Sequence, residues 1–191
     1  MLFRSEGEYI NHKSLIITSG FSTAENFNKS GTEIQTETVN SIQKQTVTPD
    51  AKLKNYKELP GNFNISPNFT VEMLSSKSSL TKCFIQESET ISYGDIIYNL
   101  AAIALNVLEP AYNTFPKIIV ASGYRTPDIS SSNSQHPFGK CVDIQFQGAT
   151  KDEYYDYAKQ LARIISYDQF ILHYCNYYYI TNNICRFFLL V

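Results

Sequence analysis

The stretch SGYRTPDISSSNSQHPFGKCVDIQF, residues 122–146, decides how this chain is organised. Its last seven residues alternate apolar and polar side chains, a pattern typical of a strand with one face on a core. The side chains predicted to point into that core are Val142, Ile144 and Phe146, and those predicted on the opposite face are Cys141, Asp143 and Gln145. The turn at 137–139 reverses the chain, so His136 before it and Asp143 on the strand can meet at one point.

The segments around this stretch mix helices and strands. Residues 116–125 are predicted to form a buried strand, and 167–180 one or two strands. Apolar residues recur at helical spacing over 92–115 and 151–166, and a short amphipathic helix is predicted near 70–76. Ser92 or Gly94 can begin the first long helix, and Pro110 is predicted to restrict its far end. Because the predicted helices and strands do not alternate in βαβ order, the expected class is α+β, a small antiparallel sheet with packed helices.

The first third of the chain differs in composition from the rest. Residues 19–63 are rich in Ser, Thr, Asn, Gln and Lys and show no sustained period, so they are predicted to be a polar linker or extended arm. Residues 1–18 are interpreted as the remnant of a preceding module, and 64–191 as the compact domain.

Composition excludes several classes of function. The formal net charge of −2 gives no electrostatic reason to expect nucleic acid as a partner. No run of 18 apolar residues occurs, so no membrane span is expected, and the N-terminus lacks the apolar region of a secretory signal. None of the four cysteines forms a C-x-x-C pair, which favours buried thiols in a protein made in a reducing cytoplasm.

His136 and Asp143 are candidate metal ligands. Zinc accepts imidazole nitrogen and carboxylate oxygen, and catalytic zinc sites use three protein ligands and a water. The alternative is that His136 caps a loop and Asp143 is a solvated strand residue.

The wider motif resembles the M15 family of zinc peptidases, which includes D-alanyl-D-alanine carboxypeptidases and phage peptidoglycan hydrolases. The family signature is approximately S-G-(Y/F)-R, a loop, then S-x-H-x-x-G-x-A-x-D-(I/L), and the resemblance covers about residues 64–180. The matching residues are Ser122, Gly123, Tyr124, Arg125, Ser134, His136, Gly139, Asp143 and Ile144. Cys141 stands where the family usually has alanine.

A closer likeness is to the C-terminal peptidase domain of baseplate hub and tail lysozyme proteins of contractile-tailed phages. It is carried by NISPNFTVEMLS, NVLEP and DQFI together with the motif above, and by SGFSTAENFNKSG in the polar arm. This resemblance implies a domain of the virion tail, made in the host cytoplasm and acting at the bacterial cell wall. Its implied partners are the peptidoglycan stem peptide and phage baseplate or tail proteins.

The resemblance also implies roles for individual residues. His136 and Asp143 would be ligands of Zn²⁺, and Arg125 would bind the substrate carbonyl or stabilise the oxyanion. Ser134 would orient the site or bind substrate. The alternatives are a surface ion pair for Arg125 and a turn cap for Ser134. Gly123 and Gly139 are interpreted as backbone requirements.

The motif is incomplete at its C-terminal end. The family has a catalytic acid after D-Q-F-I and a later W-x-H-x-S strand, whereas this chain has His173 in DQFILH and then neither Trp nor His. The third ligand is therefore His173, a cysteine such as Cys175 or Cys185, an aspartate such as Asp168, or absent. Two hypotheses follow: a domain that has lost catalysis, or a C-terminus that is truncated or out of frame. The expected function is zinc-dependent cleavage of peptide bonds in peptidoglycan, and the alternative is a catalytically impaired structural or wall-binding module of a phage tail.

Overall fold

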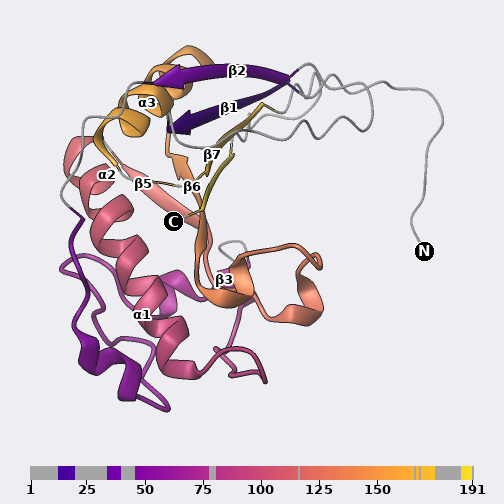
Figure 1. Ribbon diagram of the computed structural model, residues 1–191. Helices are drawn as coiled ribbons and strands as arrows, with labels where there is room; N and C mark the ends of the chain where they lie inside the picture. Colours follow the sequence, from indigo (N-terminus) through magenta and orange to yellow (C-terminus); the bar gives the residue numbers. More distant parts are fainter. Residues whose placement is uncertain are drawn as a thin grey trace.

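Within the residues that the structure describes, eight strands form one mixed sheet, and helices pack against it (Figure 1). The computed structural model describes residues 13–19, 34–39, 46–77, 81–115, 117–165, 167, 169–174 and 186–190. The strand order is β2-β1-β7-β8-β6-β5-β3-β4. The strands are β1 Lys13–Ser19, β2 Ile34–Val39, β3 Ser76–Lys77, β4 Thr81–Lys82, β5 Ile118–Ser122, β6 Cys141–Phe146, β7 Gln169–Tyr174 and β8 Arg186–Leu190. The predicted α+β class is confirmed, but the expected small antiparallel sheet is instead a larger mixed one, because β1 and β2 pair in parallel.

Strand β6 lies between β5 and β8 and is antiparallel to both. Asp143 is opposite Ser122 on one side and Phe188 on the other. The register with β5 shifts between Val120 and Ser122, which is where β5 approaches the candidate site. The central strand β8 was not predicted, because residues 187–190 are a continuous apolar run that does not alternate.

The long helix begins where the sequence predicts. In α1, Tyr93–Ile103, the N-cap is Ser92, whose hydroxyl oxygen accepts a hydrogen bond from the backbone N–H of Asp95 at 3.1 Å. The same hydroxyl donates a hydrogen bond to the Asp95 carboxylate at 2.7 Å. Ser92 is therefore bonded to both the backbone and the side chain of Asp95 in the first turn. The predicted apolar stripe is buried: Ile96, Ile97, Leu100, Ile103, Ala104, Val107 and Leu108 all lie in the core.

Pro110 does not end this helix, so that prediction is wrong. A π-helical segment, Ala104–Leu108, connects α1 to α2, Glu109–Thr114, and Pro110 lies in the first turn of α2. Proline has no N–H to donate to the carbonyl four residues earlier, and the wider π turns accommodate that missing bond. Asn106 within the π segment exchanges two hydrogen bonds with the backbone of Val47, at 2.7 and 2.9 Å.

Helix α3, Lys151–Ile164, covers the far end of β6. It begins with a capping box, in which Thr150 and Glu153 bond each other's backbone N–H. Its Tyr154 and Tyr157 rings contact Phe146 of β6, at centroid distances of 5.2 Å each. Phe146 also contacts Phe115 at 4.9 Å, so α3, β6 and the end of α2 share one core.

Part of the predicted linker is packed. Leu53, in the 3₁₀ helix η1, Ala51–Asn55, is buried in the core, and Phe63 packs against that core. The predicted helix near 70–76 is a 3₁₀ turn, η2, Glu72–Leu74, because the backbone bridge between Asn64 and Thr70 precedes it and β3 follows at once. Strands β1 and β2 lie within residues 13–39 and pair in parallel.

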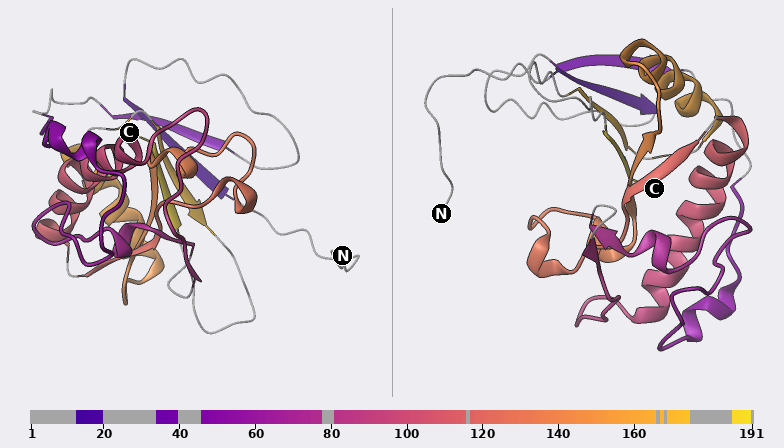
Figure 2. Two further views of the ribbon diagram at one scale, coloured as in Figure 1. Left: turned by 90° about the horizontal axis from the view of Figure 1, so that it is seen from below. Right: turned by 180° about the vertical axis from the view of Figure 1, so that it is seen from behind.

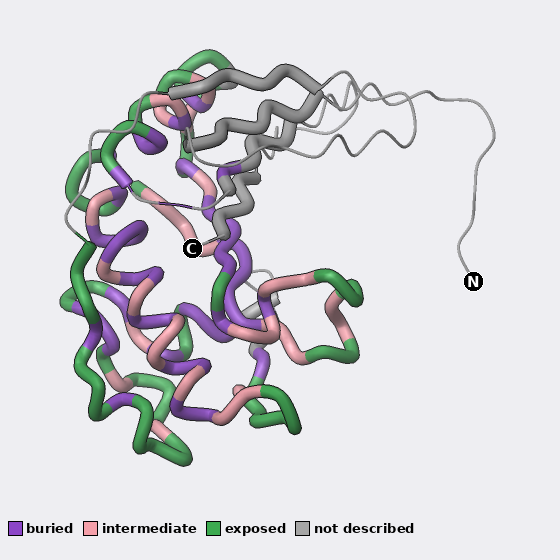
Figure 3. The backbone as a smooth tube through the Cα atoms, in the orientation of Figure 1, coloured by how far each residue is buried: buried purple, intermediate pink, exposed green. Residues whose placement is uncertain are grey.

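The loop between β5 and β6 projects on the side of the sheet away from α1 (Figure 2). Its tip is exposed, but the chain becomes buried again as it enters β6 (Figure 3). This loop contains the 3₁₀ helices η4, Pro127–Ile129, and η5, His136–Phe138. No helix in the described part of the chain combines the length and apolar character needed to cross a membrane.

Candidate metal centre

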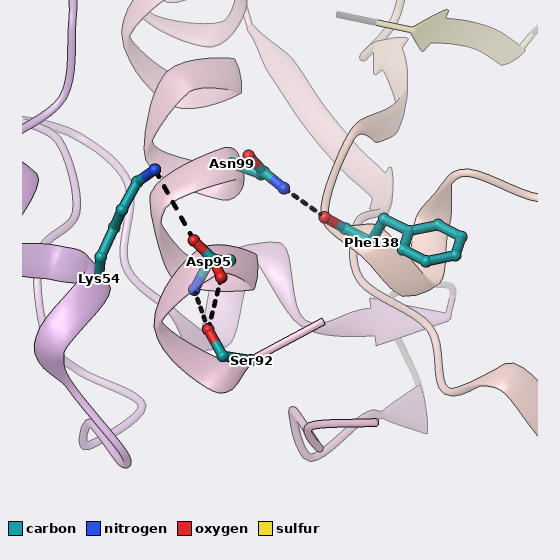
Figure 4. A network of polar contacts seen from close by, with 5 residues as sticks. All are labelled: Lys54, Ser92, Asp95, Asn99 and Phe138. Carbon is teal, nitrogen blue, oxygen red and sulfur yellow. Dashed lines mark hydrogen bonds and ion pairs between the residues drawn. The ribbon is translucent and has the colours of Figure 1, made fainter. Parts of the chain in front are cut away.

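His136 is held by a short rigid turn at the start of β6. It begins η5 and is followed by Pro137 at the first helical positions, where a missing N–H has no cost. Gly139 ends the turn at φ 65°, a left-handed conformation that glycine adopts without a steric penalty. Asn99 of α1 donates a hydrogen bond to the Phe138 carbonyl oxygen at 2.9 Å (Figure 4), which anchors this turn to the helix layer.

The imidazole of His136 is oriented by the backbone of Gly123. The Nδ1 atom lies 2.6 Å from the Gly123 carbonyl oxygen, and the side chain is only 2% exposed. A carbonyl oxygen can only accept, so Nδ1 carries the proton and donates it. In the neutral imidazole the lone pair is then on Nε2, which is the arrangement that metal-binding histidines use.

Gly123 is required by a close approach to the preceding layer. The Tyr124 N–H donates to the Leu74 carbonyl oxygen at 2.7 Å, and a Cβ on Gly123 would lie 2.1 Å from that same oxygen. The interpretation of Gly123 and Gly139 as backbone requirements is confirmed. Gly123 therefore contributes to the site through its carbonyl group, which sets the direction of the His136 ring.

Two side chains of β6 meet Nε2 of His136. The Asp143 Oδ1 atom lies 3.3 Å from it, and the Cys141 Sγ atom also lies 3.3 Å from it. Val142, Ile144 and Phe146 belong to the core cluster, so the predicted inward face of β6 is confirmed. Cys141 and Asp143 alternate with them yet are buried too, which excludes the solvated-strand alternative for Asp143.

The carboxylate of Asp143 and the imidazole of His136 face each other in this group. Oδ1 of Asp143 is buried and makes no hydrogen bond within the described residues, although Nε2 of His136 is 3.3 Å away. With Nδ1 as the donor to Gly123, a neutral His136 presents a lone pair to a carboxylate oxygen, which is repulsive. The thiol proton of Cys141, a second proton on the imidazole or a metal ion can each relieve this repulsion.

The dimensions of the group fit a metal ion. The ligand atoms of His136, Cys141 and Asp143 all lie within 4.8 Å of one another. Nitrogen and oxygen ligands about 2.0–2.1 Å from zinc lie about 3.4 Å apart at the tetrahedral angle, and a nitrogen and a thiolate sulfur about 3.6 Å apart. The observed 3.3 Å separations are close to both values. These residues could therefore hold a metal ion.

The remaining residues of the SGYR segment flank Gly123 in the sequence. The Ser122 hydroxyl and the Arg125 Nε atom are both buried without a hydrogen bond in the described part of the chain. The Tyr124 hydroxyl contacts the backbone N and O of Gln86, each at 3.2 Å, and burial raises the pKa of this phenol despite the hydrogen bond. Tyr124 is thus a structural anchor, while Arg125 keeps an unused donor.

Ser134 contacts the candidate ligand directly. Its hydroxyl oxygen accepts a hydrogen bond from the His136 backbone N–H at 3.3 Å, and its own N–H donates to Ser131. The predicted role in orienting the site is consistent with this contact, and the predicted role in substrate binding stays a prediction.

The predicted third ligand, His173, is on a strand that is not a neighbour of β6 in the sheet. Its backbone is in β7 opposite Arg186 of β8, and β8 separates β7 from β6. Asp143 lies two strands away from His173 and is displaced from it by two residues along the register. The Cα atoms of the two residues are therefore about 12 Å apart. The His173 side chain and the alternatives Asp168, Cys175 and Cys185 lie outside the described residues, so ligation by them stays a prediction.

Sequence reasoning missed Cys141. It was interpreted as a replacement for a small residue, although the alternation of 140–146 already placed Cys141 and Asp143 on the same face. The spacing H-x4-C-x-D therefore already indicates Cys141 as a candidate ligand beside His136 and Asp143.

No family model, curated protein or solved structure significantly matches this chain. The fold and the group at its centre define an α+β domain with a candidate metal centre, and the M15 resemblance rests on its motif alone.

Proposed function

We propose that this chain is a zinc-dependent peptidase domain that cleaves peptide bonds in bacterial peptidoglycan as part of a phage tail baseplate. The observation that carries the proposal is the pair formed by His136 Nε2 and Asp143 Oδ1, 3.3 Å apart and buried. The backbone carbonyl of Gly123 orients the imidazole, and within the described residues the Asp143 Oδ1 atom has no hydrogen bond. This arrangement suits a divalent ion in the ligand pattern of a hydrolytic zinc site.

A bound zinc ion would supply Lewis acidity, which polarises a carbonyl oxygen and activates water as a nucleophile. The chain's own residues would do the rest. Gly123 and Ser134 hold the His136 side chain and backbone in place. Arg125, whose Nε makes no hydrogen bond to the described residues, would bind the scissile carbonyl oxygen and stabilise the negative charge that develops on it.

A second candidate is a structural or wall-binding module of the tail that keeps the site without turnover. Two observations favour it. His136, Cys141 and Asp143 are 2%, 4% and 2% exposed, which limits the approach of a stem peptide. The group also contains one carboxylate, and with Asp143 as a ligand none is left in it to act as a general base.

Purified peptidoglycan incubated with zinc-loaded protein separates these candidates. The peptidase proposal predicts new amino termini in the released peptides and loss of this release in Arg125→Ala. The loss should be about 10²–10³-fold, the usual cost of removing an oxyanion donor. Lys140→Ala, which changes an exposed cation beside the site, is the matched control and should keep full release. Zinc binding without any release of peptides would refute the peptidase and support the structural module.

A further inference from the structure

We infer that Cys141 is the third protein ligand of the metal centre, so that the site is a His–Cys–Asp set with a thiolate in it. This inference rests on the metal centre of the proposed function but not on its peptidase activity. Cys141 is a buried thiol whose Sγ atom lies 3.3 Å from Nε2 of His136. It is two residues before Asp143 on the same strand, so both side chains leave β6 on the same face.

The three candidate ligand atoms are already close together in this structure. All three ligand atoms fall within 4.8 Å of one another, and they come from one turn and one strand that are adjacent in sequence. A site assembled from one local segment loses little chain entropy when it forms. A set containing His173 needs a residue from β7, whose backbone is separated from β6 by the whole of β8.

Charge neutralisation favours the thiolate as well. Metal binding displaces the thiol proton, which leaves with solvent, and the sulfur becomes an anion bonded to the metal. A divalent ion with the Cys141 thiolate and the Asp143 carboxylate has a net charge of zero. With a second histidine in place of the cysteine the centre would carry +1. Because every residue of the group is almost fully buried, the neutral set has the smaller desolvation cost.

The choice of ligand determines which metals the site prefers. A thiolate is a soft ligand, so this centre should select Zn²⁺ and the chemically similar Co²⁺ over Mg²⁺ and Ca²⁺, which require oxygen ligands. Three protein ligands leave one tetrahedral position for water or substrate, as in hydrolytic zinc sites.

Cobalt titration followed by absorption spectroscopy tests the inference, because a thiolate bound to Co²⁺ gives a strong near-ultraviolet charge-transfer band. The wild-type protein should show this band at one equivalent of Co²⁺. Cys141→Ser should lose the band and bind zinc more than about 100-fold less tightly, since even outer-shell changes cost 10–100-fold. Circular dichroism establishes that each variant is folded.

Three control variants make the assignment specific. Cys83→Ser removes a buried thiol outside the group and should keep the band. His173→Ala and the double variant Cys175→Ser/Cys185→Ser should keep it too. Cobalt bound without a charge-transfer band, or a band that persists in Cys141→Ser, would overturn the Cys141 assignment while leaving a metal centre at His136 and Asp143. Failure of a folded wild-type protein to bind cobalt or zinc would overturn both, and absence of peptidoglycan cleavage alone would refute only the peptidase.

Discussion

Replacing Gly123 by alanine tests whether the backbone at this position builds both the fold and the metal centre. The new Cβ would lie 2.1 Å from the Leu74 carbonyl oxygen, and Cβ contacts under 3.0 Å essentially never occur. The two segments must therefore separate by at least 0.9 Å (3.0 − 2.1). The obstacle is backbone, so no rotamer change relieves it.

This separation acts on two hydrogen bonds. It lengthens the bond from the Tyr124 N–H to Leu74, now 2.7 Å, and leaving these buried groups unsatisfied costs about 1–3 kcal/mol. It also shifts the Gly123 carbonyl oxygen away from Nδ1 of His136, now 2.6 Å. Losing such an outer-shell contact typically weakens metal binding 10–100-fold. Gly123→Ala should therefore lower the free energy of unfolding by about 1–3 kcal/mol and weaken zinc binding at least about tenfold.

Urea denaturation of the apo protein and competition for zinc with a chromophoric chelator measure the two effects separately. Gly148→Ala is the matched control, because Gly148 has φ 79° but no atom within 4 Å of the added Cβ. That variant should lose only about 1–2 kcal/mol from its left-handed backbone and keep wild-type zinc affinity. Unchanged stability in Gly123→Ala would refute the steric argument. Reduced stability with unchanged zinc affinity would refute the role of the Gly123 carbonyl at the metal centre.

Three further substitutions test the supporting structure. Hydrogen bonds from the N-cap residue of α3 hold the pKa of Glu153 below its ordinary value of 4.5, so its contribution to stability is full above that pH and is lost as pH falls through the lower folded-state pKa. The difference in melting temperature between wild type and Glu153→Gln should be largest near neutral pH and should shrink as the pH falls below 4.5. Tyr124→Phe removes the hydroxyl that contacts both backbone groups of Gln86 and should cost about 1–3 kcal/mol in urea denaturation, with an unchanged midpoint contradicting the anchor role. The buried Glu109 carboxylate accepts several hydrogen bonds, including two from Asn68. Glu109→Gln should therefore lower the free energy of unfolding by a similar amount in urea denaturation, and a more stable variant would refute this account.

Local signals predicted the elements that hold the site. Alternation in 140–146 and helical spacing in 92–115 are strong periodic patterns, and Ser92 carries its own capping chemistry. The helix end predicted from Pro110 is wrong because the π segment before this proline lets the helix continue.

The remaining features depend on contacts between distant segments. The packing of Leu53 and the bonds between Val47 and Asn106 join residues about 50–60 positions apart, which no local period reveals. Strand β8 pairs with β6 and β7, which are far from it in sequence or separated by a long segment, and its apolar run 187–190 lacks the alternation that marks a half-exposed strand. His136 and Asp143 were predictable from spacing, but the closeness of Cys141 to Nε2 depends on how Gly123 orients the imidazole.

Zinc content per chain after exhaustive dialysis tests the central claim most directly. Wild-type protein should retain about one zinc ion, and Asp143→Ala and His136→Ala should retain none while staying folded by circular dichroism. Asp152→Ala, which removes an exposed carboxylate on α3, should retain the ion. A folded wild-type protein without zinc, or an Asp143→Ala variant that binds it as tightly as wild type, would contradict the metal centre. The buried His136–Asp143 pair would then be an imidazolium–carboxylate ion pair.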